Sequence, residues 1–331
     1  MADYRAIRGL HIQSVSSDNA VTQAGDIWYN STTGKLRVVK AVGAWASGGT
    51  INSGREAAAG TGIQTAAVAF GGLMGPPASP RFRDETETYD GSSWTEVGDL
   101  NTGRLGMGGA GLSTATLAFG GSSATPNVLG ETESWNGTAW TEVADLNTDR
   151  YQGASCGTTI AANLVGGHTP SPSSFMDEYE QYNGTSWTET TDINSVRHHQ
   201  SGVGTTTALL IFGGKTPPNT ATDIVESWNG STWTEVGDLN AGKHSAGAGG
   251  TSTSAIYFGG YDNTNNLATN EEWDGTSWTE IADLATAVRE NAGASSSPSS
   301  LALSFTGYDG SLTTATEEWT KAATASSFTS S

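Results

Sequence analysis

The most informative feature of the sequence is a unit that is repeated six times. Short apolar runs that end in a pair of glycines recur along the chain, with their first glycines at positions 71, 120, 166, 213 and 259. A sixth run, ALSFTG, has Thr306 in place of the first glycine, so that successive runs lie 46 to 49 residues apart. A constant period of this kind is typical of repeat architectures in which each period forms one supersecondary unit. Its length suits four short strands with their turns.

Each repeat contains the same parts in the same order. A basic residue precedes a stretch of small side chains, and the apolar run follows; the basic residues are Arg55, Arg104, Arg150, Arg197, Lys243 and Arg289. After a variable loop, an acidic strand ends in an aromatic residue. In the first five repeats an Asp-Gly or Asn-Gly turn and a tryptophan come next, as in WNGTAW at 135–140. Such turns between apolar residues indicate hairpins, so each repeat is predicted to be a four-stranded meander.

Side-chain size increases along each repeat, which favours a radial arrangement of the sheets. Glycine, alanine and serine dominate the first strand, whereas the last strand begins with a tryptophan, at positions 94, 140, 187, 233 and 278. In a β-propeller the first strands converge on the axis, and the last strands splay at the rim, where indoles fill the space. We therefore predict an all-β fold, a six-bladed β-propeller that spans residues 41–331.

The numbering also predicts how this propeller closes. In the first four complete repeats the rim tryptophan lies ten residues before the next basic residue, and Trp45 likewise lies ten residues before Arg55. The sixth repeat has Thr324 where its own rim tryptophan is expected. We predict that residues 42–48 pair with residues 315–320 as an amino-terminal strand around Trp45, which would remove the open edge of a linear array.

The segment RLGMGGAGLSTATLAFGG, followed by ETESWNGTAW, resembles the kelch repeat, with its basic residue, double glycine and pair of aromatics. The resemblance covers about residues 45–320 and recurs six times. It implies a kelch-like propeller, in agreement with the packing argument. It implies little about activity, because propellers serve as adhesins, scaffolds and occasionally enzymes.

Residues 1–40 do not follow the repeat. The stretch GDIWYNSTTGKLRVV at 25–39 alternates and predicts a β-hairpin with its turn at Asn30 to Gly34. It resembles short motifs near the starts of tail-fibre and other virion proteins of tailed bacteriophages. That resemblance implies an attachment segment that contacts other virion proteins, and a location on the virion, at the tail or the particle surface.

Composition excludes several classes of partner. The chain has 15 basic and 34 acidic residues, a formal charge of -19, which disfavours binding to nucleic acid. No apolar stretch is long enough to predict a transmembrane segment, and no secretory signal is expected. The single cysteine, Cys156, cannot form an internal disulfide and is interpreted as a compact filler near the axis.

We find no motif for nucleophilic, phosphate-binding or acid–base catalysis, and expect no enzyme activity, no cofactor and no metal. The repeated basic residues are interpreted as structural, through hydrogen bonds to carbonyls or to the acidic strand. The residues that follow them are expected to line one mouth of the central channel: Glu56, Leu105, Tyr151, His198, His244 and Glu290. Two histidines near carboxylates could bind a divalent metal, but solvated or hydrogen-bonded histidine is the default interpretation.

The loops between the second and third strands differ in length and chemistry, whereas the framework barely changes. All of them should emerge on one face, and a constant framework with divergent loops is a common design for recognition. The candidate ligand-binding residues there are Arg81, Phe82, Arg83, His168, Phe175, Lys215, Tyr261 and Tyr308. The alternative interpretation is neutral drift in exposed turns.

The leading hypothesis is a non-enzymatic phage virion protein, a tail fibre or similar adhesin, whose loops bind a host surface glycan or protein. One alternative is a structural or decoration protein that contacts neighbouring virion subunits alone. A metal-dependent oxidase or lyase is less favoured, because Cys156 aligns with small residues of the other repeats. Whether the chain forms a homo-oligomer is left open.

Overall fold

A computed structural model of the chain describes residues 12–17, 26–75, 81–124, 127–170 and 173–327. These residues form strands, turns and bends, with no helix among them, and therefore no helix that could cross a membrane. The chain divides into two compact units, one made of Met1–Ala44 with Thr320–Ser331 and the other of Trp45–Trp319. The division predicted from the repeats lies at residue 40, and the same prediction includes Thr320–Ser331 in the propeller, whereas these residues group with the amino-terminal unit.

The unit Trp45–Trp319 contains five four-stranded antiparallel sheets, each a meander in chain order. The first consists of β4 (Ala59–Ile63), β5 (Ala66–Phe70), β6 (Thr86–Tyr89) and β7 (Trp94–Glu96). The second consists of β8 (Gly108–Leu112), β9 (Ala115–Phe119), β12 (Thr132–Trp135) and β13 (Trp140–Val143). The third consists of β14 (Ala154–Thr158), β15 (Ala161–Pro170), β16 (Ser173–Tyr182) and β17 (Trp187–Glu189). The fourth consists of β18 (Ser201–Thr205), β19 (Ala208–Phe212), β22 (Val225–Trp228) and β23 (Trp233–Glu235). The fifth consists of β24 (Gly247–Thr251), β25 (Ser254–Phe258), β26 (Asn270–Trp273) and β27 (Trp278–Ile281).

A further sheet joins strands from both ends of the chain. Its order is β1 (Gln13–Val15), β2 (Ile27–Asn30), β3 (Lys35–Ser47), β30 (Thr316–Ser327), β29 (Leu301–Phe305) and β28 (Ala292–Gly293). Two loops carry small two-stranded sheets of their own: β10 (Ser122–Ala124) with β11 (Asn127–Val128), and β20 (Lys215–Thr216) with β21 (Thr220–Ala221). The predicted four-stranded meander is therefore confirmed for the first five repeats.

Within the unit that contains the amino terminus, β2 and β3 form the predicted hairpin. Ile27 pairs with Val38 and Asn30 with Lys35 in an antiparallel register. The Asn30 side chain accepts hydrogen bonds from the backbone of Thr32 and Thr33, as expected of an asparagine that begins a turn. Residues 1–11 and 18–25 of the predicted attachment segment lie outside the described residues.

At the start of the Trp45–Trp319 unit, the end of β3 lies beside the start of β30. The Gly48 N–H donates to the Thr316 carbonyl at 2.8 Å, and the Ile51 N–H donates to the Thr314 carbonyl at 3.0 Å. The Trp45 indole contacts the rings of Trp319 and Phe258, with centroids 5.6 and 5.1 Å apart. Trp45 thus lies beside the third strand of the sixth repeat, as the ten-residue spacing predicts for a last strand.

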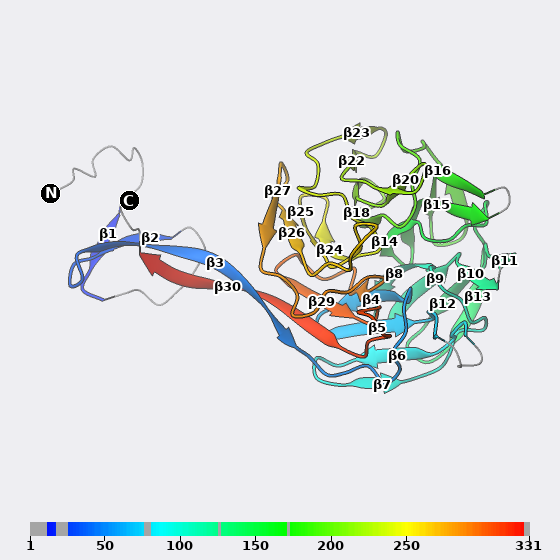
Figure 1. Ribbon diagram of the computed structural model, residues 1–331, viewed down its shortest axis with the longest axis horizontal. Coiled ribbons are helices and arrows are strands. Elements are labelled where there is room, and N and C mark those ends of the chain that lie inside the picture. Colours follow the sequence, from blue (N-terminus) through cyan, green and yellow to red (C-terminus); the bar gives the residue numbers. More distant parts are fainter. Residues whose placement is uncertain (1–11, 18–25, 76–80, 125–126, 171–172, 328–331) are drawn as a thin grey trace. The chain divides into compact units, whose positions relative to one another are not determined.

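The apolar cores of this unit lie between neighbouring sheets. One such core joins Val68 and Phe70 of the first sheet to Trp135 and Trp140 of the second. The Trp140 indole also donates a hydrogen bond across the same boundary, to the Thr86 hydroxyl. Figure 1 shows the sheets following one another in chain order around a common centre, with β4, β8, β14, β18 and β24 innermost.

Small side chains are needed at this centre because the innermost strands are close neighbours. Strand β4 lies next to β8, β8 next to β14, β14 next to β18, β18 next to β24, and β28 contacts both β24 and β4. A Cβ at Gly60 would come within 2.4 Å of the Phe305 ring and 2.7 Å of the Gly293 carbonyl oxygen. The architecture is therefore all-β and propeller-like, with glycine-rich strands at the middle and tryptophans at the outside.

Candidate functional site

Five of the repeated basic residues are buried and pair with a glutamate on the third strand of their sheet. The pairs are Arg55–Glu87 at 2.8 Å, Arg104–Glu133 at 2.6 Å, Arg150–Glu180 at 2.6 Å, Arg197–Glu226 at 2.9 Å and Lys243–Glu271 at 3.9 Å. The second oxygen of each glutamate accepts the backbone N–H of the asparagine three residues before the cation, as Glu133 does from Asn101 at 2.8 Å. These residues hold a connecting segment against a sheet, so the structural interpretation of them is confirmed.

The sixth repeat departs from this pattern, and the assignment of Arg289 as its buried basic residue is wrong. Val288 occupies the equivalent position: it lies four residues after Leu284, as Arg104 lies four after Leu100, and it is buried. Glu317 keeps the other half of the arrangement and accepts the Ala285 N–H at 2.8 Å. The signal was present in the sequence, because Val288, not Arg289, lies ten residues after the rim tryptophan Trp278.

A cycle of six backbone hydrogen bonds links the segments that lead into the innermost strands. Each N–H donates to the carbonyl of the preceding member, at 2.7 to 3.1 Å, and the first member donates to the last. The members are Ala57, Gly106, Gln152, His199, Ser245 and Glu290. All six have a positive φ, between 52° and 60°. This left-handed backbone conformation is unusual for residues other than glycine, and it occurs at the equivalent position of each of the six repeats.

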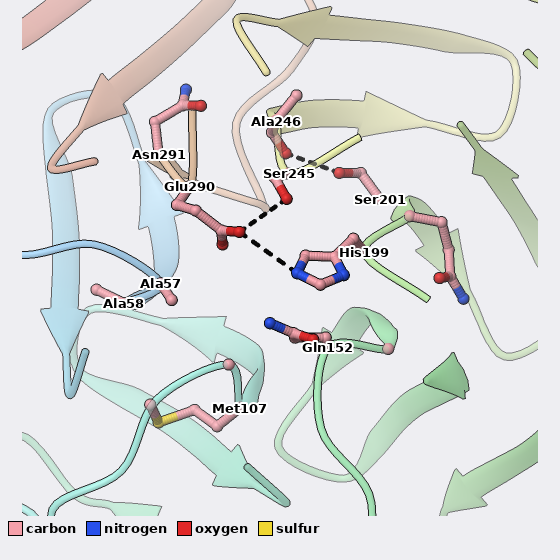
Figure 2. A pocket seen from close by; sticks show the side chains of 13 residues that line it. Ala57, Ala58, Met107, Gln152, His199, Ser201, Ser245, Ala246, Glu290 and Asn291 are labelled. Carbon is pink, nitrogen blue, oxygen red and sulfur yellow. Dashed lines mark hydrogen bonds and ion pairs between the residues drawn. The ribbon is translucent and has the colours of Figure 1, made fainter. Parts of the chain in front are cut away.

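The cycle borders a pocket of about 130 Å³ that the side chains of Gln152, His199, Ser245 and Glu290 share. Figure 2 shows Glu290 directed toward both His199 and Ser245. One Glu290 oxygen lies 3.3 Å from the His199 Nε2 and accepts a hydrogen bond from the Ser245 hydroxyl at 2.8 Å. Burial acts to raise the pKa of Glu290, but His199 and Ser245 outweigh it and lower the pKa to about 2. Glu290 is therefore a carboxylate at neutral pH.

The residues predicted to line one mouth of the central channel do not belong to the cycle, except for Glu290. Each of the others immediately precedes a member of the cycle in the sequence. Glu56, Leu105, Tyr151, His198 and His244 form isolated bridges with the residue that follows each glycine pair, as Tyr151 does with His168. The off-by-one assignment in the sixth repeat is the reason that Glu290 alone falls on the cycle. Sequence reasoning therefore missed Gln152, His199 and Ser245.

His198 and His244 are buried and neutral. Burial and the neighbouring His199 lower the pKa of His198 to about 2 and that of His244 to about 3. The His244 ring is held by the Ser245 hydroxyl at 2.9 Å and by the Asn263 side-chain oxygen at 3.2 Å. These imidazoles pack as polar aromatic groups, as hydrogen-bonded histidines were expected to do.

The bridges also define one surface, which we call the loop face: the end of the sheets where the second strand leads into the third and where one sheet leads into the next. Lys215 bridges His198, Tyr261 bridges His244, and Tyr308 bridges Arg289. The candidate residues His168, Lys215, Tyr261 and Tyr308 thus occupy equivalent positions beside the cycle. Parts of three loops on this face, residues 76–80, 125–126 and 171–172, lie outside the described residues.

The remaining candidates lie farther along two of these loops. The Phe175 ring contacts the rings of His168 and His198, with centroids 6.1 and 4.6 Å apart. Phe82 bridges Leu73. Arg81 donates to the Met74 carbonyl at 3.4 Å, and Arg83 pairs with Glu85.

Because Val288 takes the buried position, Arg289 lies on the loop face, between two tyrosines. Its guanidinium is 4.9 Å from the centre of the Tyr261 ring and 4.6 Å from that of the Tyr308 ring. It donates to the Asn266 side-chain oxygen at 3.3 Å. This arrangement orients a cation on the loop face, next in sequence to the pocket residue Glu290, and it was not predicted.

Among the described residues, no three histidine, cysteine, aspartate or glutamate side chains come together in a way that could hold a metal ion. Cys156 is buried in β14, and burial raises the pKa of its thiol to about 12. A thiol with so high a pKa is a poor nucleophile at neutral pH.

Comparison with models of known protein families finds no match for this chain, and comparison with curated proteins finds none either. The resemblance to the kelch repeat therefore rests on the repeated residues themselves.

Proposed function

We propose that residues 45–319 form a six-bladed kelch-like propeller that the strand around Trp45 closes. The proposal is supported by the cycle of six backbone hydrogen bonds, in which Ala57 donates to Glu290 and so links the first repeat to the sixth. It is also supported by the hydrogen bond between Gly48 and Thr316, next to the Trp45–Trp319 contact.

We propose that this propeller is a non-enzymatic adhesin of a phage particle, a tail fibre or similar protein, which binds a host surface glycan or protein through the loop face. The observation that carries the proposal is the contrast between a framework that repeats its buried cation–glutamate pairs and the loops on one face, which differ from repeat to repeat. Constant scaffolds that display divergent loops are suited to recognition.

The attachment role belongs to the amino-terminal segment. The hairpin of β2 and β3 carries the motif that resembles virion proteins, and it belongs to a compact unit separate from the repeats. We propose that this unit contacts other virion proteins, which would place the chain on the tail or the particle surface.

The test is an adsorption assay with particles that carry loop variants. The loops of residues 215–224 and 261–269 are exchanged for each other, with the glycine pairs before them and the strands after them unchanged. Adsorption to host cells is expected to fall, while particles assemble in normal numbers. The matched control exchanges the Asn-Gly and Asp-Gly turns at 229–232 and 274–277, at the opposite end of the sheets, and should leave adsorption unchanged. Normal adsorption after the loop exchange would contradict the adhesin proposal and favour a decoration protein.

A further inference from the structure

The lysines and arginines of residues 45–319 fall into two groups according to where they lie in the fold. Five are the buried partners of strand glutamates: Arg55, Arg104, Arg150, Arg197 and Lys243. The other four are Arg81, Arg83, Lys215 and Arg289, and all four lie on the loop face. In a chain with 34 acidic and 15 basic residues, the cations that the framework does not use are concentrated on one surface.

The other surfaces of this unit carry the opposite charge. The last strands expose one glutamate in each of the first five sheets: Glu96, Glu142, Glu189, Glu235 and Glu280. The turns at the far end of the sheets expose Asp90 and Asp274. The loop face carries aspartates too, among them Asp262 and Asp309, but it is the surface of this unit where cations lie as well. An anionic ligand would therefore be attracted locally, to Lys215 and Arg289, because charge complementarity directs the approach of a ligand.

Two of the loop-face cations, Lys215 and Arg289, have no carboxylate partner among the described residues. Arg289 is fixed between Tyr261 and Tyr308. Burial lowers the pKa of Lys215, the carboxylate of Glu290 raises it, and the positive charge of Arg289 lowers it. The charges of Lys215 and Arg289 therefore act on each other. The nearby Glu290 is already engaged by His199 and Ser245.

The side chains around these cations suit a carbohydrate better than a protein. Tyr261 and Tyr308 are half-buried. Arg289 covers part of each ring, and the remaining ring surface and the phenol hydroxyls combine apolar contact with hydrogen bonding. The large apolar residues exposed in the described structure are Ile63, Leu112, Ile160 and Leu301, and all of them lie at the opposite end of the sheets. The loop face therefore lacks, among its described residues, the exposed aliphatic anchors typical of protein interfaces.

We propose that the loop face around Lys215, Tyr261, Arg289 and Tyr308 binds an acidic glycan, a carbohydrate that carries carboxylate or sulfate groups. Arg289 would present its planar guanidinium to the acidic group, a geometry that favours two parallel hydrogen bonds. Lys215 adds a second positive charge, and the tyrosine rings contact the sugar. This inference rests on the proposed function and specifies the class of its ligand.

The test is calorimetric titration of the full chain with polygalacturonate, dextran sulfate, uncharged dextran and double-stranded DNA. Polygalacturonate or dextran sulfate is expected to bind, and binding should weaken as the salt concentration rises. The stronger of these two polymers identifies the acidic group. Dextran and DNA should not bind. Binding of DNA as tight as that of the charged glycans would show general attraction to polyanions and would overturn the inference, as would binding of dextran or failure of both acidic polymers to bind.

Variants assign the binding to named residues. The double variant Lys215→Gln/Arg289→Gln should weaken binding about tenfold or more, equivalent to about 1.4 kcal/mol or more. The control is Lys35→Gln, which removes one positive charge at an exposed position in the amino-terminal hairpin and should leave affinity unchanged; the single variants Lys215→Gln and Arg289→Gln are its charge-matched counterparts and should each weaken binding. Circular dichroism verifies that each variant is folded. Equal loss in the control would overturn the assignment to the loop face.

The two proposals fail separately. Loss of adsorption in the loop exchange without any binding of acidic polymers would leave the adhesin proposal standing and refute the ligand class. Binding of an acidic polymer that depends on Lys215 and Arg289, combined with normal adsorption, would support the ligand class and refute the role in host attachment.

Discussion

The first five repeats and the sixth repeat use the same fold with different buried chemistry. In the second repeat, Glu133 pairs with Arg104 and also accepts the Asn101 N–H. In the sixth, Glu317 accepts the Ala285 N–H, but Val288 replaces the cation. The sixth repeat also has Thr306 in place of a glycine and lies beside Trp45, which comes from the other end of the chain.

This difference separates what the fold requires from what it tolerates. The glutamate-to-backbone hydrogen bond is present in all six repeats, whereas the cation is present in five. The hydrogen bond is therefore the common element that joins a connecting segment to its sheet. The cation neutralises a carboxylate that is almost completely buried in the first five repeats, while Glu317, with 9% of its surface exposed, retains some contact with water.

The largest expected effect comes from making a complete repeat resemble the sixth. Arg104→Val leaves the buried Glu133 without its cation, and breaking a buried pair by removing one partner costs about 3–5 kcal/mol. Urea unfolding followed by tryptophan fluorescence measures the loss. The matched control is Glu317→Gln, which alters a carboxylate that has no such cation and should cost about 1 kcal/mol. Equal losses in the two variants would show that the cation contributes nothing beyond the hydrogen bond.

An effect of similar size is expected at the rim, where an ordinary rim tryptophan can be compared with Trp45. Trp140 is 6% exposed, contacts Phe70 and donates to the Thr86 hydroxyl. Trp140→Ala should cost about 3–5 kcal/mol, the usual range for a buried tryptophan. Trp45 is less buried and its indole N–H has no partner among the described residues, so Trp45→Ala should cost about half as much. Calorimetric unfolding measures both changes, and Trp45→Phe, which keeps an aromatic ring, is the control and should cost less than Trp45→Ala. A Trp45→Ala variant as stable as the parent chain would contradict its place in the core.

Much of the repeat could be predicted from the sequence because its signals are local. An Asn-Gly or Asp-Gly turn and a tryptophan at a constant spacing specify the third and fourth strands of a sheet without reference to other sheets. The same spacing predicted that Trp45 lies near the sixth repeat, where it contacts Trp319. The buried pairing of Arg104 with Glu133 was also accessible, because both positions recur in each complete repeat.

The hydrogen-bonded cycle could not be predicted because side-chain patterns do not mark it. Its members range from Ala57 and Gly106 to Glu290, and their common property is a left-handed backbone in contact with the neighbouring repeat. The arrangement of Arg289 between Tyr261 and Tyr308 was missed for a different reason. Arg289 was assigned as the nearest basic residue, whereas the spacing from Trp278 indicated Val288.

The repeats also differ at the position where the fourth and fifth have His198 and His244 and the sixth has Arg289. This difference should make the stability of the chain depend on pH. The folded-state pKa values of His198 and His244, about 2 and 3, lie below the unfolded value of about 6.5. Below pH 6.5 these histidines take up protons in the unfolded chain but not in the folded chain, so the stability that depends on them should fall as pH decreases, and their contribution should be level above pH 7. The loss between pH 7 and pH 5 should be about 2–4 kcal/mol.

Urea unfolding at a series of pH values measures this loss. The double variant His198→Gln/His244→Gln should flatten the profile between pH 7 and pH 5, because glutamine does not titrate. Carboxylates contribute mainly below this window, since their unfolded pKa values are near 4. A profile as steep in the double variant as in the parent chain would show that other groups are responsible.

The smallest expected effect is a gain in stability from making the sixth repeat resemble the others. Thr306 has a φ of 57°, is 1% exposed, and its hydroxyl has no partner among the described residues. A β-branched residue in this conformation is strained, and an unsatisfied buried hydroxyl adds to the cost. Thr306→Gly should therefore stabilise the chain by about 1 kcal/mol, after the added flexibility of glycine in the unfolded chain is subtracted. The converse variant, Gly213→Thr, would place a Cβ 2.5 Å from the Lys243 carbonyl oxygen and should destabilise the chain. Thermal unfolding measures both, and a less stable Thr306→Gly variant would show that the threonine makes a favourable contact that outweighs its backbone strain.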